Sequence, residues 1–364
     1  MDVIRILTGR WHTIVPPIAL VALAFAWGTH PGGLVSLLLG VILAASVLAA
    51  VHHAEVVAAR VGEPLGSVIL ALAVTVIEVG LIVMTMTGPK AQPTLARDTI
   101  FAAVMITLNG IVGLSLLVNA GRQGQALFRA KGSGGMLAAV MTLAAVTMVL
   151  PNYTAVPGPT YTGAQLTFAS VASLLLYVLF VTTATGSHRD FFLPVDSQGN
   201  RVDPEEDHAE PPSNREALIS VALLLGSLVA VVGLAKVETY AIEDALAFFG
   251  LPASFVGIVI AVLVLAPETM AAVRASQRDR VQTSLNLAYG SAVASIGLSI
   301  PALALASVLL NQPLHLGLAP QHLALLALTG IVSILTVVPG RAERLQAAVH
   351  LVILAAYVFL AAAP

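Results

Sequence analysis

Long apolar stretches recur along almost the whole chain, and short polar segments separate them. Most of these stretches are close to the length of about 20 residues that an α-helix needs to cross about 30 Å of hydrocarbon. They do not alternate polar and apolar positions, as the strands of a membrane β-barrel would. The pattern predicts 11 membrane-spanning helices, at residues 11–28, 33–51, 65–87, 99–120, 135–150, 165–185, 217–236, 252–273, 283–310, 322–338 and 345–362.

The composition also indicates an all-α polytopic membrane protein. Of the 364 residues, 58% are hydrophobic and only 10% are charged, and the mean hydropathy is +0.93. A soluble domain usually carries about 25% charged residues. The chain has no cysteine, which excludes a disulfide-stapled secreted domain and thiolate metal sites. The net charge of −2 provides no basic surface for nucleic acid, so the lipid bilayer is the expected surrounding.

The positions of the basic residues predict the orientation of the spans. If the amino terminus is cytoplasmic, only three of the 17 Lys and Arg residues, Lys90, Arg97 and Lys236, fall in outer loops. The other 14 fall on the inner side, as the positive-inside rule requires. We therefore expect a multi-pass protein of an inner (plasma) membrane without a cleavable signal peptide. Its amino terminus is expected in the cytoplasm and its carboxyl terminus in the periplasm or outside the cell.

The longest polar stretch, residues 186–215, is acidic and divides the spans into two sets. Five spans after the first one precede this stretch, and five follow it. Because five is odd, the two sets would have opposite orientations, as in a transporter built from inverted repeats. The predicted organisation is an extra amino-terminal helix (1–32), a first five-helix repeat (33–185), a cytoplasmic acidic linker (186–215) and a second five-helix repeat (216–364).

Two glutamates lie inside predicted spans at matching places. An ungapped alignment of residues 67–78 with 257–268 superposes Glu78 on Glu268. A charge at this depth costs about 2.5–3.5 kcal/mol on insertion scales, and no Lys or Arg lies at mid-depth to neutralise either one. Each glutamate must then either bind a cation and a proton in turn or stay protonated as a hydrogen-bonded residue of the core. We expect the pair to share a pocket that cations and protons occupy in turn.

Other oxygen-bearing residues lie near these acids in the predicted spans. Thr75 lies one turn before the first glutamate on the same helical face. Pro267 lacks an amide hydrogen, and a helix broken there would release backbone carbonyls as ligands. Asn109, Ser291 and Ser295 add amide and hydroxyl oxygens, which suit a hard cation such as calcium. The alternative for these polar residues is close packing and hydrogen bonding between helices.

At these residues the chain resembles the ChaA-type bacterial calcium/proton antiporters of the calcium/cation antiporter superfamily, which are related to the CAX exchangers. The resemblance is carried by residues 52–64, 73–79, 108–114, 188–194 and 290–301. It implies two inverted five-helix repeats and an extra amino-terminal helix. It also implies export of cytoplasmic Ca²⁺ in exchange for H⁺, with Na⁺ or K⁺ as alternative cations. By resemblance, Glu78 and Glu268 are the paired ion-binding acids, and Asn109 and Ser291 are supporting ligands.

A second polar cluster, His52, His53 and Glu55, lies at the inner end of the second span. Histidine titrates near neutral pH, so we expect this cluster to sense pH or to relay protons. The alternative function class is a membrane-embedded hydrolase that uses the cluster with a metal, but the usual hydrolase motifs are missing. A passive channel is a third alternative. The sequence favours a secondary transporter that is not an enzyme and needs no resident cofactor.

Overall fold

The computed structural model describes residues 2–62, 65–86, 93–187, 189–193 and 212–363. Nearly all of them are helical. Within these residues, nine helices are long and apolar enough to cross a membrane, and the segments Trp11–Ala26 and Val68–Met84 are shorter apolar helices. Together they account for the 11 spans, so the predicted all-α polytopic fold is confirmed. The chain forms two compact units: Met1–Gln92 with Ala209–Val256 (unit 1), and Pro93–His208 with Gly257–Pro364 (unit 2).

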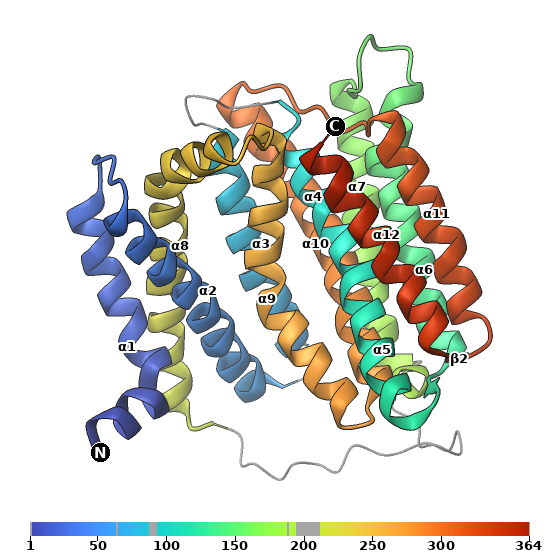
Figure 1. The fold of residues 1–364 in the computed structure, drawn as a ribbon, viewed down its shortest axis with the longest axis horizontal. Helices are drawn as coiled ribbons and strands as arrows, with labels where there is room; N and C mark the ends of the chain where they lie inside the picture. The colour runs from blue at the N-terminus through green and yellow to red at the C-terminus, as the bar shows by residue number, and fades with distance from the viewer. Residues whose placement is uncertain (1, 63–64, 87–92, 188, 194–211, 364) are drawn as a thin grey trace. The chain divides into compact units, whose positions relative to one another are not determined.

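Unit 1 contains four long helices, all labelled in Figure 1. Helix α2 packs along α8, α1 packs against both of them, and α3 also packs against both. Helix α8 begins with a capping box, in which the Ser213 and Glu216 side chains each accept a hydrogen bond from the other's backbone N–H. The elements are α1 (Asp2–Ala26), α2 (Leu34–Val61), α3 (Leu65–Met86), α8 (Asn214–Phe248) and the 3₁₀ turn η6 (Ala253–Phe255).

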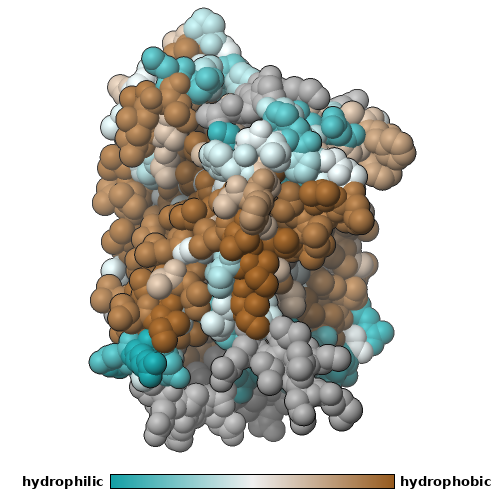
Figure 2. Space-filling model, turned by 90° about the vertical axis from the view of Figure 1, so that its left-hand side faces the viewer, coloured by the Kyte–Doolittle hydropathy of each residue, from teal (hydrophilic) through white to brown (hydrophobic). Residues whose placement is uncertain are grey.

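The outward-facing side chains of unit 1 are strongly apolar. Figure 2 shows a broad hydrophobic band on the face it presents, with hydrophilic residues gathered above the band. Such a band is the surface that the hydrocarbon of a bilayer covers. Large exposed hydrophobic residues of α1, α2 and α8 include Ile18, Val21, Phe25, Leu34, Leu37, Leu38, Leu218, Leu225 and Val229.

Unit 2 is built around α10, which packs against α4, α5, α6 and α7. Helix α12 lies beside α5, as Figure 1 also shows, and packs against α11. The π-helical turn η1 interrupts the span that contains α4 and α5. The helices are α4 (Leu95–Met105), α5 (Val112–Gln123), α6 (Ala130–Ala144), α7 (Gly163–Thr182), α9 (Val256–Gln277), α10 (Val281–Leu310), α11 (Pro320–Val337) and α12 (Arg344–Ala362). The shorter turns are the π-helical η1 (Ile106–Ile111), η2 (Ala145–Val149) and η4 (Thr183–Ser187), and the 3₁₀ η3 (Leu150–Tyr153) and η5 (Arg189–Phe192).

Unit 2 also contains a short β-ladder. Two short strands, β1 (Ala126–Leu127) and β2 (Arg341–Ala342), pair in antiparallel fashion. They belong to the loop between α5 and α6 and to the loop between α11 and α12. The pairing supplies hydrogen-bond partners to backbone groups that these short loops would otherwise leave unsatisfied. Of the linker predicted at 186–215, residues 188 and 194–211 lie outside the described residues.

Candidate cation-binding site

The first predicted ion-binding acid, Glu78, lies in the middle of α3 in unit 1. Its side chain is only 2% exposed. Thr75, one turn earlier, is also buried, and its hydroxyl donates a hydrogen bond to the Ala71 carbonyl at 2.8 Å. The hydroxyl hydrogen of Thr75 is therefore engaged, but its oxygen keeps lone pairs on the helical face that carries Glu78.

Close packing of α3 on α8 fixes the position of this part of α3. Two residues after Glu78, a Cβ atom on Gly80 would lie 2.5 Å from Cγ2 of Val232 in α8. Only a glycine leaves enough room for this approach. The contact restricts the rotation of α3 and therefore the direction in which the Glu78 side chain projects.

The second predicted acid, Glu268, lies in α9 of unit 2 and is half-buried. A helix broken at Pro267 would have released backbone carbonyls as ligands, but α9 runs without interruption from Val256 to Gln277. The proline still lacks an amide hydrogen, so the helix locally lacks one hydrogen bond. A single missing hydrogen bond is tolerated where neighbouring helices support the chain on both sides.

Helix α9 is held against the α4–η1–α5 span near both of its ends. Near its start, a Cβ atom on Gly257 would lie 2.9 Å from the Thr99 backbone nitrogen in α4. Near its end, the Ser276 hydroxyl donates a hydrogen bond to the Ser115 carbonyl in α5. Since the first parts and the last parts of the two spans meet, the spans run parallel and side by side.

These contacts place Asn109 and Glu268 at nearly the same depth. Glu268 lies about 12 Å before Ser276 along α9, and Asn109 lies about 9 Å before Ser115 along its own span, at 1.5 Å per residue. Measured from the other contact, Glu268 lies about 16 Å after Gly257, and Asn109 about 15 Å after Thr99. By either measurement, the depths of Glu268 and Asn109 differ by at most about 3 Å.

Ser291 belongs to the same level of unit 2. The Ser284 hydroxyl donates to the Ser115 hydroxyl, which fixes the register between α10 and α5. Ser291 lies about 10 Å beyond Ser284 in the direction of Asn109, because α10 runs antiparallel to α5. Ser291 is half-buried, and Ser295, one turn further along α10, is buried. Unit 2 thus brings a carboxylate, an amide and a hydroxyl group to one layer.

The Asn109 side chain is fully buried and hydrogen-bonded to two other helices. Its Nδ2 donates to the Thr329 hydroxyl of α11 at 3.0 Å, and its Oδ1 lies 3.1 Å from Nδ1 of His350 in α12. The other ring nitrogen of His350 lies 3.1 Å from the Thr336 hydroxyl. His350 is a residue that sequence reasoning missed, although it is the only histidine within the apolar segment 345–362.

Of the predicted His52, His53 and Glu55 cluster, the two histidine rings lie together, with centroids 5.5 Å apart. His53 is buried: its Nε2 donates to the His12 carbonyl of α1 at 3.0 Å, and its Nδ1 lies 3.3 Å from the Ser220 hydroxyl of α8. The rings of His12 and His52 are 4.0 Å apart, whereas Glu55 is exposed. Within the described residues, no three His, Asp or Glu side chains are arranged to hold a metal ion. His12 is a member of the histidine cluster that the sequence did not reveal.

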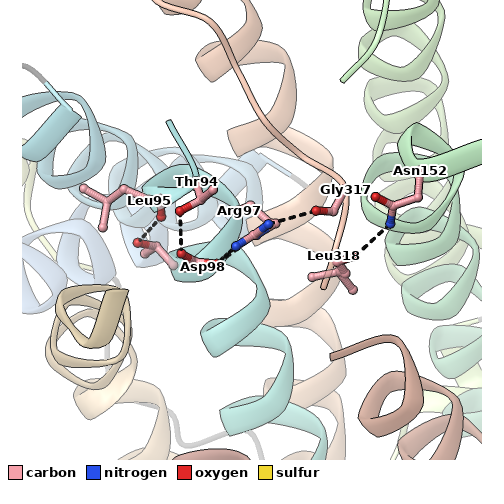
Figure 3. A network of polar contacts seen from close by, with 8 residues as sticks. Thr94, Leu95, Arg97, Asp98, Asn152, Gly317 and Leu318 are labelled. Atoms are coloured by element: carbon pink, nitrogen blue, oxygen red, sulfur yellow. Dashed lines mark hydrogen bonds and ion pairs between the residues drawn. The ribbon is translucent and has the colours of Figure 1, made fainter. Parts of the chain in front are cut away.

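A polar network that sequence reasoning also missed lies at the start of α4 (Figure 3). Arg97 forms an ion pair with Asp98 at 2.7 Å and donates to the Gly317 carbonyl at 2.9 Å. Thr94 donates to the other oxygen of Asp98 at 2.9 Å. The adjacent opposite charges in the sequence were a signal for this pair. The network links α4 to the segment before α11, and both oxygens of the Asp98 carboxylate take part in it.

The fold defines a polytopic membrane protein, and in such proteins intramembrane carboxylates commonly mark ion pathways. The pattern of the sodium/calcium exchanger protein family matches residues 30–186 and 219–363. The chain belongs to this family, as the sequence resemblance to calcium/cation antiporters predicted.

Two bacterial relatives match almost the whole chain. One is y4hA of Sinorhizobium fredii, a protein named as an ionic transporter, which is 40% identical over 97% of this chain and 96% of its own length. The other is the sodium-potassium/proton antiporter ChaA of Escherichia coli, which is 32% identical over 94% of each chain. The chain is therefore a multi-pass membrane protein of a family of exchangers, and that family is not one of enzymes.

Two solved structures have the same fold. Native YfkE matches with a TM-score of 0.68 and 15% identity over 95% of this chain and 97% of YfkE. The H⁺/Ca²⁺ exchanger CAX matches with a TM-score of 0.68 and 13% identity over 96% of this chain and 91% of CAX. At such low identity the likeness shows the arrangement of the helices and no shared substrate.

Proposed function

We propose that the protein is a secondary active antiporter that exports cytoplasmic Ca²⁺ in exchange for H⁺. Membership of the exchanger family supports exchange, and the burial of Glu78 in the middle of an apolar helix carries the assignment of the ion-binding acid. Glu268 is proposed as the second acid, with Asn109, Ser291, Thr75 and Ser295 as supporting ligands. No resident cofactor is needed, because the cation and the proton are the substrates.

The charges of the two acids suit a divalent cation. Each glutamate is the only charged residue in the apolar core of its span. Two carboxylates balance the charge of one Ca²⁺, and two protons balance the same charge after the cation leaves. In the proposed cycle both acids release protons and bind the cation when they are open to the cytoplasm. They release the cation and take up protons when they are open to the other side. Calcium accepts six to eight oxygen ligands in flexible geometry, which amide and hydroxyl groups help to provide.

The alternative is exchange of Na⁺ or K⁺ for H⁺. The observation that favours it is the 32% identity with a relative that is named as a sodium-potassium/proton antiporter. One acid would then suffice to balance a monovalent cation. The second acid would carry a proton throughout the cycle or would bind a second cation.

The two proposals are separated by one assay. Everted membrane vesicles are given an acidic interior, and the collapse of the pH gradient is followed after addition of Ca²⁺, Na⁺ or K⁺. We expect Ca²⁺ to collapse the gradient at the lowest concentration. A response to Na⁺ and K⁺ without one to Ca²⁺ would replace calcium exchange by monovalent exchange. Vesicles that respond to none of the three would contradict both proposals.

The assignment of the acids is tested with glutamine variants in the same assay. We expect Glu78→Gln and Glu268→Gln each to abolish exchange without unfolding the protein, because glutamine cannot cycle between a charged and a neutral form. Glu216→Gln is the matched control, because Glu216 is exposed and a capping box accepts glutamine at that position. Wild-type exchange by either of the first two variants would refute its role as an ion-binding acid.

The predicted repeats and the histidine cluster belong to the same proposal. The exchanger family pattern matches on both sides of the 186–215 stretch, which supports two five-helix repeats at 33–185 and 216–364.

The contact of His53 with both α1 and α8 supports a role of the histidines near the inner end of unit 1 in pH sensing or proton relay. Glu55 is exposed and would take part only through solvent.

A further inference from the structure

His350 is a buried polar residue in the apolar helix α12. It is fully buried, although histidine is costly to bury in an apolar span unless both ring nitrogens find partners. Both nitrogens have a partner: Nδ1 lies 3.1 Å from Oδ1 of Asn109, and Nε2 lies 3.1 Å from the Thr336 hydroxyl. The imidazole thus connects α12 to η1 on one side and to α11 on the other.

The hydrogen bonds fix the direction of the Asn109 amide group. A carboxamide oxygen only accepts hydrogen bonds, so Nδ1 of His350 carries the hydrogen in the bond to Asn109. The amide nitrogen of Asn109 donates to the Thr329 hydroxyl at 3.0 Å. Because both ends of the amide are held, rotation about its terminal bond would break two hydrogen bonds at once. The oxygen keeps a second lone pair, whose direction the two bonds determine.

The backbone that carries Asn109 is itself unusual. Asn109 lies in the π-helical turn η1, and such turns are frequent at functional sites. This turn lies at the level of Glu268 and Ser291, as the contacts of Ser115 show. A cation held in this layer would be sensitive to small changes in the direction of the Asn109 oxygen. Partners that orient a ligand in this way typically change metal affinity 10- to 100-fold when they are removed.

We propose that His350 is a positioning residue of the cation site, which acts through its hydrogen bond to Asn109 without touching the cation. The inference rests on the proposed function, and in particular on Asn109 as a supporting ligand. His350 sets the affinity for the cation, and the glutamates carry the exchange itself.

Asparagine and glutamine variants of His350 separate this role from simple packing. An asparagine amide can take the place of Nδ1, so His350→Asn keeps the bond to Asn109 and loses the bond to Thr336. A glutamine amide can take the place of Nε2, so His350→Gln keeps the bond to Thr336 and loses the bond to Asn109. Thr336→Val is a further control, because it removes the Thr336 hydroxyl, which contacts His350 and the Val332 carbonyl, and leaves the bond between His350 and Asn109.

The experiment uses the purified full-length chain and three probes: Ca²⁺, Na⁺ and K⁺. Cation binding is measured by isothermal titration calorimetry, as the free cation concentration that half-saturates the site. The rate of exchange is measured separately in proteoliposomes. We expect His350→Gln to raise the half-saturating concentration about tenfold with a similar maximal rate. His350→Asn and Thr336→Val should stay within about twofold of the wild type, because their bond to Asn109 is intact.

Two results would overturn the proposal. One is a wild-type half-saturating concentration for His350→Gln. The other is an equal loss of affinity in His350→Gln, His350→Asn and Thr336→Val, which would show that the affinity does not depend on the bond between His350 and Asn109. The failure of the proposed function is a different result: the wild type would bind a cation but would exchange none for protons. The binding midpoints of the variants would still decide the role of His350.

Discussion

The hydroxyl of Ser276 in α9 donates a hydrogen bond to the backbone carbonyl of Ser115 in α5. Both residues are fully buried, so water does not compete for this bond. The hydroxyl of Ser115 in turn accepts a hydrogen bond from Ser284 in α10. One residue therefore sets the register of three helices in unit 2. The common level of Glu268, Asn109 and Ser291 depends on this register.

The register of α5 and α10 is testable by cross-linking, because the natural chain contains no cysteine. We expect the double substitution S115C/S284C to form a disulfide under mild oxidation, since the two hydroxyl groups are in hydrogen-bond contact. The control pair S115C/S299C should not react, because Ser299 lies about 22 Å further along α10. Mass spectrometry of the digested protein identifies the linked peptides. A link in the control pair alone would show that the register is different.

Close packing of α10 on α7 predicts unequal effects of two glycine substitutions on one helix. A Cβ atom on Gly297 would lie 2.8 Å from Cβ of Tyr177, whereas one on Gly290 would lie 3.8 Å from Cζ of Phe180. We expect Gly297→Ala to lower the free energy of unfolding by about 1–3 kcal/mol, because α7 and α10 must move apart. Gly290→Ala should be neutral or stabilising by up to about 1 kcal/mol, because alanine favours a helix. Thermal unfolding in detergent measures both, and equal melting temperatures would contradict the packing.

The spans were predictable because about 20 apolar residues in a row have few other stable arrangements. The ends of the helices were less predictable. The predicted span 217–236 stops where polar residues begin, but α8 continues to Phe248. A drop in hydrophobicity marks the expected edge of the membrane, whereas a helix ends only where its backbone hydrogen bonds end. The sequence also left open whether the helix breaks at Pro267; α9 continues through it, because packing can support a helix through one missing hydrogen bond.

The candidate site was predictable only as a set of residue types. Glu78 and Glu268 stand out because each is the only charge in its apolar segment, and their roles remain predictions. The partners of Asn109 could not be read from one sequence, because Thr329 and His350 are more than 200 residues away along the chain. The π-helical turn that contains Asn109 also has no clear sequence signal. These features arise from packing between helices and not from local preference.

The ion pair of Arg97 and Asp98 predicts a large effect of a small substitution. The side chains are only 12% and 8% exposed. Asp98→Asn keeps the shape of the side chain but removes the charge that balances the Arg97 guanidinium. Breaking a buried ion pair from one side costs about 3–5 kcal/mol, and we expect the lower part of this range because the pair is not fully enclosed. The melting temperature of the purified protein measures the effect.

The control for this substitution is Asp279→Asn. Asp279 is exposed in the turn between α9 and α10, where its φ of 62° is a conformation that asparagine also tolerates. Its carboxylate accepts a hydrogen bond from Asn119 at 2.7 Å, and an asparagine oxygen can accept the same bond. We expect a change below about 0.5 kcal/mol. Equal losses in both variants would show that the Arg97–Asp98 pair contributes nothing beyond an exposed carboxylate.

The distribution of basic residues predicts that the two ends of the chain lie on opposite sides of the membrane. Eleven spans are an odd number, and 14 of the 17 Lys and Arg residues fall on one side of them. Reporter fusions test this directly, because alkaline phosphatase folds only outside the cytoplasm and green fluorescent protein fluoresces only inside it. We expect phosphatase activity without fluorescence for fusions after residue 364. Fusions after residue 187 should show the reverse, because six spans return the chain to the cytoplasm. Fluorescence at residue 364 would contradict the orientation, and equal signals at both sites would contradict five spans in the second half.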